Sequence, residues 1–341
     1  MSKKIFITGG AGYVGSRLVP FLLQKGYFVT VFDIMHYTAD FLPKNENKLN
    51  IIKGDIRDTN KVKEACKDHD YFLHLACISN DASFVLDEKL SQSVNFDCFE
   101  PMVIAAKENN IKRFIYASSS SVYGISNRKD VKEDHPLLPL TAYNKFKGMC
   151  EPLLLGHSDD NFETVIFRPA TVCGYGPRMR FDLSVNILTC NAICNNKIRV
   201  FGGDQLRPNL HIMDYCKAVL MLLIAKKEKV HKEVFNIGYE NLSINQIFNV
   251  GFENYSVEKL ALMVQENISE KVELQYNKSD DNRSYHINSD KIYRILNFKP
   301  NLKIEDAVKE IIEKFNQNKF NDPMNNEIYY NVKTLLNNKV S

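Results

Sequence analysis

The sequence predicts an α/β protein with a doubly wound parallel sheet and a smaller α+β domain in its C-terminal half. Short apolar strands alternate with helical stretches through the first half of the chain, a pattern that produces right-handed βαβ units with parallel strands. The first strand runs into a glycine-rich turn, KIFITGGAGYVG, from Lys4 to Gly15. With 341 residues, of which 44% are apolar, the chain can bury a large core and form one large or two modest domains.

The glycine turn follows a short buried strand at residues 5–7 and opens a helix. Its glycines have the spacing G-x-x-G-x-x-G. Gly9 forms the turn without a Cβ, Gly12 lets the backbone approach a pyrophosphate, and Gly15 lets the helix pack closely on the sheet. The N-terminus of that helix faces the anion. We therefore expect the phosphates of a dinucleotide to bind here.

The second strand, Tyr27 to Phe32, ends in Asp33, about 20 residues beyond the turn. An acidic residue at that place binds the hydroxyls of the adenosine ribose. It favours NAD over NADP, because its charge repels a 2′-phosphate and the next residues, Ile34 and Met35, bring no arginine.

Further strands are expected at Leu49–Lys53, Tyr71–Leu75, Arg113–Ala117, Thr164–Arg168 and Val234–Ile237. Ligands of such sheets lie outside the carboxyl ends of the strands. Asp55 and Ile56 are therefore placed to hold adenine, and Ala76 is placed to pass under the dinucleotide. A simple turn residue is an equally good interpretation of Asp55.

The composition excludes several classes of protein. The net charge of +3 is small and no basic stripe is present, so nucleic acid is not an expected partner. No apolar run approaches the about 18 residues of a membrane span, and the N-terminal lysines lead directly into a strand, so we expect a cytoplasmic protein without a membrane partner. The eight cysteines form no C-x-x-C pair, and Cys190 and Cys194 have no nearby histidine, so no metal site is expected.

A second informative cluster, Thr141 to Lys147, begins a helix after a proline-containing loop. Tyr143 and Lys147 are four residues apart and lie on the same helical face. A phenol has a pKa of about 10, and a nearby ammonium together with a nicotinamide cation would lower it toward the working pH. Tyr143 is therefore a candidate acid/base, and a serine at the preceding strand end is a candidate partner for the same substrate oxygen.

Six motifs occur in order along the chain: TGGAGYVG, Asp33, Gly54-Asp55-Ile56, HLAC (His74 to Cys77), SSSSVYG (Ser118 to Gly124) and YNKFK (Tyr143 to Lys147). Together they resemble the extended short-chain dehydrogenase/reductase family, in particular its NAD-dependent nucleotide-sugar epimerases and dehydratases. The resemblance runs from Lys4 to roughly Phe315. It implies a Rossmann-type fold, NAD as cofactor, a nucleoside-diphosphate sugar as substrate, and hydride transfer that usually oxidises C4 of the sugar.

By this resemblance Tyr143 is the catalytic base, Lys147 binds the nicotinamide ribose and lowers the pKa of the tyrosine, and Ser119 holds the reacting hydroxyl. The cofactor-binding residues that it implies are Gly9, Gly12, Tyr13, Val14, Asp33, Asp55, Ile56, Leu75, Ala76, Tyr143 and Lys147. The substrate-binding residues that it implies are Ser79, Asn80, Ser120, Thr171, Arg178, Asn186, Arg207 and Arg283.

The match to the family loosens after the sixth strand. Family epimerases commonly have an asparagine three residues after the arginine of that strand, and here Thr171 stands in its place with fewer donors. The segment GPRMRFD adds Arg178 and Arg180. Arg207 lies in a segment that resembles the one whose arginine grips the pyrophosphate. A surface ion pair is the alternative for each of these arginines.

A second phosphate-binding basic residue is expected near the segment DDNRSYHINSDKI. Arg283 is the candidate and Lys278 is the second choice, because the sequence does not set the register.

Three functions remain open after these observations. Family dehydratases have acidic residues just after the catalytic serine or threonine, whereas this chain has Ser120 and Ser121, which disfavours 4,6-dehydration. A 4-epimerase is the first expectation. A C4 dehydrogenase that releases a 4-keto sugar is the second, since Arg168 to Asn186 is similar to the same segment of GDP-heptose 4-dehydrogenases. A dinucleotide-binding regulator without catalysis is the third.

The expected NAD-binding domain comprises residues 1–170 and about 208–238, and the expected nucleotide-sugar domain comprises about 171–207 and 239–320, followed by a mobile tail at 321–341. The helices at Ser93 to Asn110 and Ala142 to Gly156 carry more apolar surface than one sheet face needs. By resemblance they pair across a two-fold axis in a four-helix bundle, which gives a homodimer or a tetramer.

A short internal repeat is independent of the family resemblance. Residues 235–243 and 248–256 match at six of nine positions, which indicates a tandem duplication. We expect the first copy to supply the strand at Val234–Ile237 and the second to begin the helix Val257 to Gln265 at Tyr255 or Ser256. The residues between, about 239–254, are then an insertion at the rim between the domains, either a surface loop or a lid over the sugar site.

Overall fold

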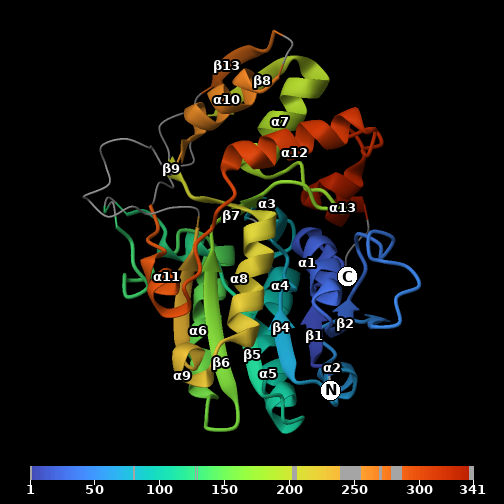
Figure 1. Cartoon of the computed structure of the whole chain (residues 1–341), viewed down its shortest axis with the longest axis vertical. Coiled ribbons are helices and arrows are strands. Elements are labelled where there is room, and N and C mark those ends of the chain that lie inside the picture. Colours follow the sequence, from blue (N-terminus) through green and yellow to red (C-terminus); the bar gives the residue numbers. More distant parts are fainter. Residues whose placement is uncertain are drawn as a thin grey trace.

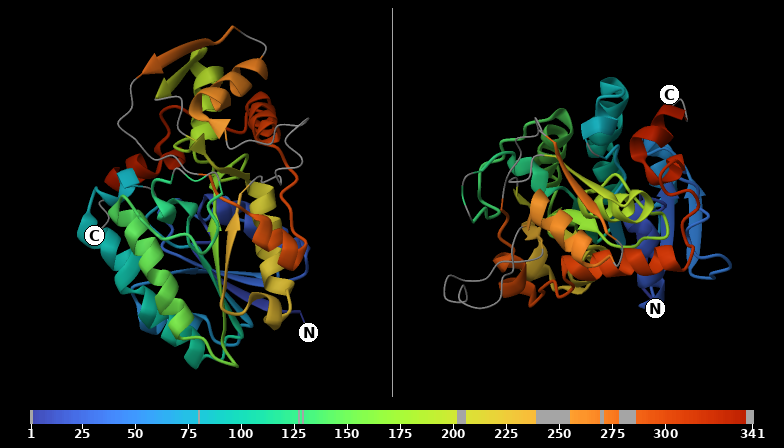
Figure 2. Two further views of the ribbon diagram at one scale, coloured as in Figure 1. Left: turned by 90° about the vertical axis from the view of Figure 1, so that its left-hand side faces the viewer. Right: turned by 90° about the horizontal axis from the view of Figure 1, so that it is seen from above.

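The computed structural model describes residues 2–79, 81–126, 128, 130–201, 206–238, 255–268, 271–277 and 286–337. Figure 1 shows a sheet with flanking helices in the lower part of the molecule and a smaller group of helices and strands above it. The smaller part covers the ends of the strands, so that residues from both parts meet above the sheet (Figure 2).

The sheet has seven parallel strands in the order β11-β6-β5-β4-β1-β2-β3. Their bounds are β1 Lys4–Thr8, β2 Phe28–Asp33, β3 Leu49–Lys53, β4 Tyr71–His74, β5 Arg113–Ala117, β6 Glu163–Pro169 and β11 Glu233–Ile237. This confirms the doubly wound fold class. The strand order reverses between β1 and β4, and a ligand crevice forms at such a switch point.

Helices cover both faces of the sheet because each contributes an apolar stripe to one of two cores. One core includes α1 (Tyr13–Gln24), α8 (Ile212–Ile224) and α11 (Asp290–Leu296). The other includes α2 (Thr59–Ala65), α5 (Phe99–Glu108) and α6 (Ala142–Gly156). The position of α11 differs from the expected domain boundary, since Ile292 and Leu296 pack on the sheet although residues 239–320 were assigned to the sugar-binding part.

Shorter elements connect the strands of the sheet. They are α3 (Asp81–Phe84), α4 (Glu88–Gln92), the π-helical turn η1 (Ser93–Asp97), the 3-10 turn η2 (Ser120–Tyr123) and α9 (Lys227–Val230). The helix expected from Ser93 to Asn110 is therefore divided, because its first turn is the π-helical η1 and the α-helix begins only at Phe99.

The smaller part is built around a separate apolar cluster between α7 (Ser184–Asn195), α10 (Val257–Glu266) and α12 (Ile304–Asn316). Among the described residues, its strands form three short pairs. They are β7 (Thr171–Cys173) with β10 (Asn209–His211), β8 (Lys197–Phe201) with β13 (Glu273–Asn277), and β9 (Leu206–Arg207) with β12 (Tyr255–Ser256).

The C-terminal end differs from the mobile tail that we expected. Residues 327–337 form the 3-10 turn η4 (Glu327–Tyr329) and the helix α13 (Asn331–Asn337). Tyr329 is 5% exposed and packs edge-on against Phe181 and Phe320. The polar, asparagine-rich composition of this segment suggested no ordered packing, but the aromatic contacts of Tyr329 hold it against the rest of the protein.

The described residues of the repeat lie at the junction that we predicted. Phe235 to Ile237 of the first copy belong to β11, and Ser256 of the second copy is the N-cap of α10, where its side chain accepts a hydrogen bond from the Lys259 amide. This confirms the expected start of the helix. The expected insertion at 239–254 lies outside the described residues.

Candidate functional site

A cavity of about 430 Å³ opens at the carboxyl ends of the strands. Its wall contains, from the predicted residues, Gly9, Gly12, Tyr13, Val14, Asp33, Asp55, Ile56, Leu75, Ala76, Ser79, Ser119, Ser120, Tyr143, Lys147, Thr171 and Arg178. All the predicted cofactor-binding residues and all three predicted catalytic residues thus face one space, as do four predicted substrate-binding residues.

The glycine turn has the backbone that its spacing predicts. Gly9 has a φ of 76°, and a Cβ there would lie 2.5 Å from the amide nitrogen of Ala76, so only glycine allows the turns after β1 and β4 to approach each other. Gly12 is the N-cap of α1 and provides no side-chain acceptor for the first amides of the helix. Those amides line the cavity at Tyr13 and Val14, which suits a pyrophosphate.

The Asp33 carboxylate is held in place by two backbone amides. Oδ2 accepts a hydrogen bond of 2.9 Å from Ala11, and Oδ1 accepts one of 2.8 Å from Met35. Burial raises the pKa of Asp33, while the two amides and the charge of Arg178 act in the opposite direction. Arg178, 145 positions along the chain, lies near enough for its charge to act on Asp33, and each carboxylate oxygen keeps a lone pair for a ribose hydroxyl.

Asp55 combines both of the interpretations that the sequence left open. It lines the cavity, but its Oδ2 also accepts hydrogen bonds from the Arg57 side chain at 2.6 and 2.9 Å, and its Oδ1 caps the Arg57 amide. Burial raises the pKa of Asp55, and the hydrogen bonds from Arg57 outweigh this and lower it overall. The neighbouring Ile56 is 5% exposed and offers an apolar surface to a base.

Tyr143 and Lys147 lie on α6, which begins at the N-cap Thr141. Lys147 is 4% exposed, and its ammonium donates a hydrogen bond of 2.9 Å to the Ala117 carbonyl and lies 5.0 Å from the centre of the Tyr116 ring. The carbonyl at the end of β5 thereby fixes the lysine close to Ser119, two residues later in the chain. The three groups suit proton transfer to and from a sugar hydroxyl.

A chain of hydroxyls continues from Ser119 to α6. The Oγ atoms of Ser119 and Ser121 are 2.7 Å apart, and Ser121 donates a short hydrogen bond to Oδ1 of Asn144. The Asn144 side chain lines the cavity, and its Nδ2 has no partner among the described residues. Asn144 is not among the residues predicted from the sequence, although its place next to Tyr143 in the helix was a signal.

Two arginines from the loop after β7 enter the cavity wall. The Arg178 guanidinium stacks 3.7 Å above the Tyr37 ring and donates a hydrogen bond of 2.6 Å to Asn331. Arg180 forms an ion pair of 2.9 Å with Asp182 and also donates to Ser79. Burial lowers the pKa of Arg178 to about 10, so its charge persists at neutral pH. Both arginines are buried, which makes the surface ion pair the weaker interpretation.

Asn186 stands outside the cavity wall. Its Nδ2 donates to the Tyr13 hydroxyl at 3.2 Å and to the Arg180 carbonyl at 2.9 Å, and its Oδ1 accepts from the Gly174 amide. The side chain is fully buried, so the structure places it as a link between α1 and the loop after β7. Of the remaining predicted residues, Arg207 has only its backbone described, in β9, and Asn80 and Arg283 lie outside the described residues.

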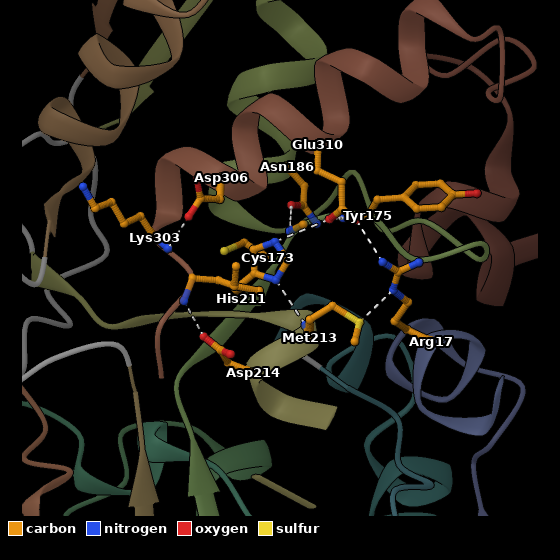
Figure 3. Close-up of polar contacts among 12 residues, drawn as sticks. Arg17, Cys173, Tyr175, Asn186, His211, Met213, Asp214, Lys303, Asp306 and Glu310 are labelled. Atoms are coloured by element: carbon orange, nitrogen blue, oxygen red, sulfur yellow. Dashed lines mark hydrogen bonds and ion pairs between the residues drawn. The ribbon is translucent and has the colours of Figure 1, made fainter. Parts of the chain in front are cut away.

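A polar cluster joins the two parts of the molecule beside the cavity (Figure 3). Glu310 of α12 accepts hydrogen bonds of 3.0 Å from Arg17 of α1 and from the Tyr175 amide, and lies 3.4 Å from Nε2 of His211. Nδ1 of His211 accepts from the Met213 amide, so Nε2 carries the proton that faces Glu310. Burial raises the pKa of Glu310, but these partners outweigh it and lower the pKa overall.

The described residues contain no group of three potential ligands that could hold a metal ion, and all eight cysteines are free. Within the same part of the chain, every helix is too short or too polar to cross a bilayer.

Comparisons with known proteins agree with this geometry. The NAD dependent epimerase/dehydratase family matches residues 5–238. The chain is similar to human dTDP-D-glucose 4,6-dehydratase, with 28% identity over 93% of this chain and 91% of that protein. It is also similar to a putative UDP-glucose 4-epimerase of Methanocaldococcus jannaschii, with 27% identity over 90% and 97%.

Among solved structures, UDP-glucuronic acid 4-epimerase of Bacillus cereus, in complex with UDP-glucuronic acid and NAD, has a TM-score of 0.80 and 25% identity over 92% of this chain and 99% of that chain. The cofactor is NAD, which fits the open amides of α1 and the fixed Asp33 carboxylate. The chain belongs to the NAD-dependent epimerase/dehydratase family, whose members are enzymes that act on nucleotide sugars.

Proposed function

We propose that this enzyme is a nucleotide-sugar 4-epimerase that oxidises C4 transiently and then reduces it. The observation that carries the proposal is the side-chain set around the reaction site. Tyr143, Lys147 and Ser119 line the same cavity as the dinucleotide turn, and the positions after Ser119 hold the hydroxyls of Ser120 and Ser121. A hydroxyl is too weak a base for the C5 proton abstraction of a dehydration.

The residues divide the chemistry among themselves. NAD, when bound, supplies the acceptor for the hydride of the sugar carbon. The Lys147 charge stabilises Tyr143 as a phenolate, and this phenolate takes the proton of the C4 hydroxyl and becomes a neutral phenol. Ser119 bonds to the same oxygen, and its contact with Ser121 limits the rotation of its hydroxyl. For the reverse step Tyr143 returns the proton to that oxygen, once the sugar presents its other face.

A C4 dehydrogenase is the second candidate, and it would use the same three side chains but release the keto sugar. The two reactions differ in whether reduced NAD accumulates. In an epimerase the reduced cofactor is consumed within each turnover, so free NADH stays at the background level. Dehydration, the activity named for several relatives, would instead give a product that has lost water.

The test uses purified enzyme with NAD and a panel of UDP, dTDP, GDP and CDP sugars, with products identified by NMR and mass spectrometry. Tyr143→Phe is expected to keep NAD binding and to lose turnover by about 100-fold or more. Tyr276→Phe, on the exposed strand β13, is the matched control and should retain full activity. If Tyr143→Phe turns over at the wild-type rate, the assignment of the base is wrong. If wild-type enzyme binds NAD but converts no sugar of the panel, a regulator without catalysis becomes the better interpretation.

A further inference from the structure

The C-terminal segment 327–337 lies outside the matched family region, yet it reaches the reaction cavity. The carbonyl of Tyr329 accepts a hydrogen bond of 2.9 Å from the Phe181 amide, and its ring is enclosed by aromatic side chains. Helix α13 then packs against α3, and Asn331 and Leu335 become part of the cavity wall. The end of the chain is thus anchored two residues before Asn331.

Asn331 is 3% exposed and forms hydrogen bonds with three residues, of which Arg178 and Ser79 line the cavity. Its amide nitrogen donates to Asp182 at 3.1 Å, its Oδ1 accepts from Nη2 of Arg178 at 2.6 Å, and its Nδ2 donates to Oγ of Ser79 at 2.8 Å. Arginine has donors only, so the oxygen of the carboxamide must face Arg178. The orientation of the side chain is therefore set by chemistry, and its nitrogen must face Ser79.

The hydrogen bonds that Ser79 forms within the protein leave its hydroxyl one further hydrogen bond, as a donor. Its oxygen accepts from Asn331 and, at 3.1 Å, from Nη1 of Arg180, so both of its lone pairs are occupied. The hydroxyl proton is left to donate, and Ser79 lies in the cavity wall. Through these contacts Asn331 and Arg180 leave the Ser79 hydroxyl able to donate a hydrogen bond but not to accept another.

Arg178 has an unused donor beside it. Its side chain is 1% exposed and lines the cavity, and its Nε has no partner among the described residues. Buried donors of native proteins normally have acceptors, so this nitrogen indicates a ligand with an acceptor oxygen. The carboxylates of Asp182 and Asp33 both lie near the guanidiniums of Arg178 and Arg180, so it is the unused Nε donor of Arg178 that indicates the ligand.

We propose that Asn331 is a positioning residue through which the C-terminal segment aligns Arg178 and Ser79 as paired donors to the oxygens of a bound diphosphate. This inference deepens the proposed function and rests on it, because the diphosphate belongs either to the nucleotide sugar or to NAD. Arginine and hydroxyl donors side by side suit the closely spaced oxygens of such a group.

The test is Asn331→Ala. This variant removes both side-chain hydrogen bonds and keeps the hydrogen bond from the backbone amide of residue 331 to Asp182. Calorimetry measures the Kd of UDP, dTDP, GDP and CDP, of NAD, and of the nucleoside that corresponds to the tightest diphosphate. The Kd of that diphosphate is expected to rise about tenfold with the Kd of the nucleoside unchanged. The thermal midpoint should fall modestly, because Arg178 and Ser79 lose a buried hydrogen-bond partner. A rise confined to NAD would support the same donors and identify the cofactor as the source of the diphosphate.

Asn337→Ala, an exposed asparagine on the same helix, is the matched control and should bind every probe as the wild type does. Asn331→Asp keeps the acceptor for Arg178, but it cannot donate to Ser79 and it adds a negative charge near the diphosphate. It should therefore weaken the diphosphate at least as much as Asn331→Ala does, and it serves as the main variant if Asn331→Ala does not fold. Adding Ser79→Ala to Asn331→Ala should weaken the diphosphate less than the two single effects predict together.

The inference is overturned if folded Asn331→Ala binds diphosphates and NAD as tightly as wild type, or if it weakens the nucleoside to the same degree. Failure of wild-type enzyme to bind any of the four nucleoside diphosphates would remove the nucleotide-sugar function instead. The Kd of NAD for wild type and Asn331→Ala would then be the only measurement that tests the role of Asn331.

Discussion

Glu151 and Arg168 form a buried ion pair behind α6, and removing one of the two charges should lower the stability of the protein strongly. Glu151 lies on α6 one turn after Lys147, is 3% exposed, and accepts hydrogen bonds from Arg168 at 2.6 and 3.0 Å and from Ser118 at 2.6 Å. Arg168 is 4% exposed and donates further to the Tyr123 hydroxyl. Burial opposes the charge of Arg168, but Glu151 outweighs it and raises the pKa of the guanidinium.

Glu151→Gln keeps the shape of the side chain and leaves the Arg168 cation buried without a counter-charge. Removing one partner of a buried pair costs about 3–5 kcal/mol. At about 2 °C per kcal/mol for a large domain, this corresponds to a fall of roughly 6–10 °C in thermal midpoint. Equilibrium unfolding in urea, followed by circular dichroism, measures the free energy directly, and the slope of the transition should stay that of the wild type.

Two further variants make the Glu151 experiment decisive. Combining Glu151→Gln with Arg168→Met removes both charges and should recover most of the lost stability. A buried ion pair and uncharged side chains of similar volume contribute similar free energies of unfolding. Glu305→Ala removes an exposed partner of Lys309 and should leave the transition unchanged. The reasoning is refuted if Glu151→Gln costs less than about 1 kcal/mol, because Arg168 would then be compensated by other means.

Three other predictions follow from the site and from the sequence. Asp33→Ala should raise the Kd of NAD by about 10- to 100-fold, the value of one charged hydrogen bond, and relax the discrimination against NADP; a wild-type preference for NADP would contradict the role of Asp33. Glu310 has a lowered pKa, so its charge stabilises the fold at neutral pH, and this stabilisation is lost as the pH falls below 4.5. The difference in unfolding free energy between wild type and Glu310→Gln, measured in urea, should therefore shrink over that range. A difference that grows would contradict this expectation. Ultracentrifugation at micromolar concentration should show a dimer through α5 and α6, and a monomer would exclude the four-helix interface.

The parts of the protein that depend on neighbouring residues were determined by the sequence itself. The glycine spacing, the position of Asp33 at a strand end and the four-residue spacing of Tyr143 and Lys147 are local patterns, and the structure places all of them on one cavity. The seven strands and the helix Ala142–Gly156 follow from apolar periodicity and capping in the same way. Even the start of α10 at Ser256 was readable from the repeat, because an N-cap is a local hydrogen bond.

Other features were decided only by the tertiary structure, because they join residues more than a hundred positions apart. Asn331 meets Ser79 across 252 positions and Arg178 across 153, and no local pattern marks an asparagine in a polar tail for that place. The side chain of Asn186 forms a hydrogen bond with Tyr13 of α1, 173 positions away, and others with the loop after β7, so it links these two segments. Arg178 came to act on Asp33 because folding moved it next to Tyr37. Local propensity creates the elements, whereas the hydrogen bonds of a buried side chain depend on which distant backbone and side-chain groups the core brings within reach.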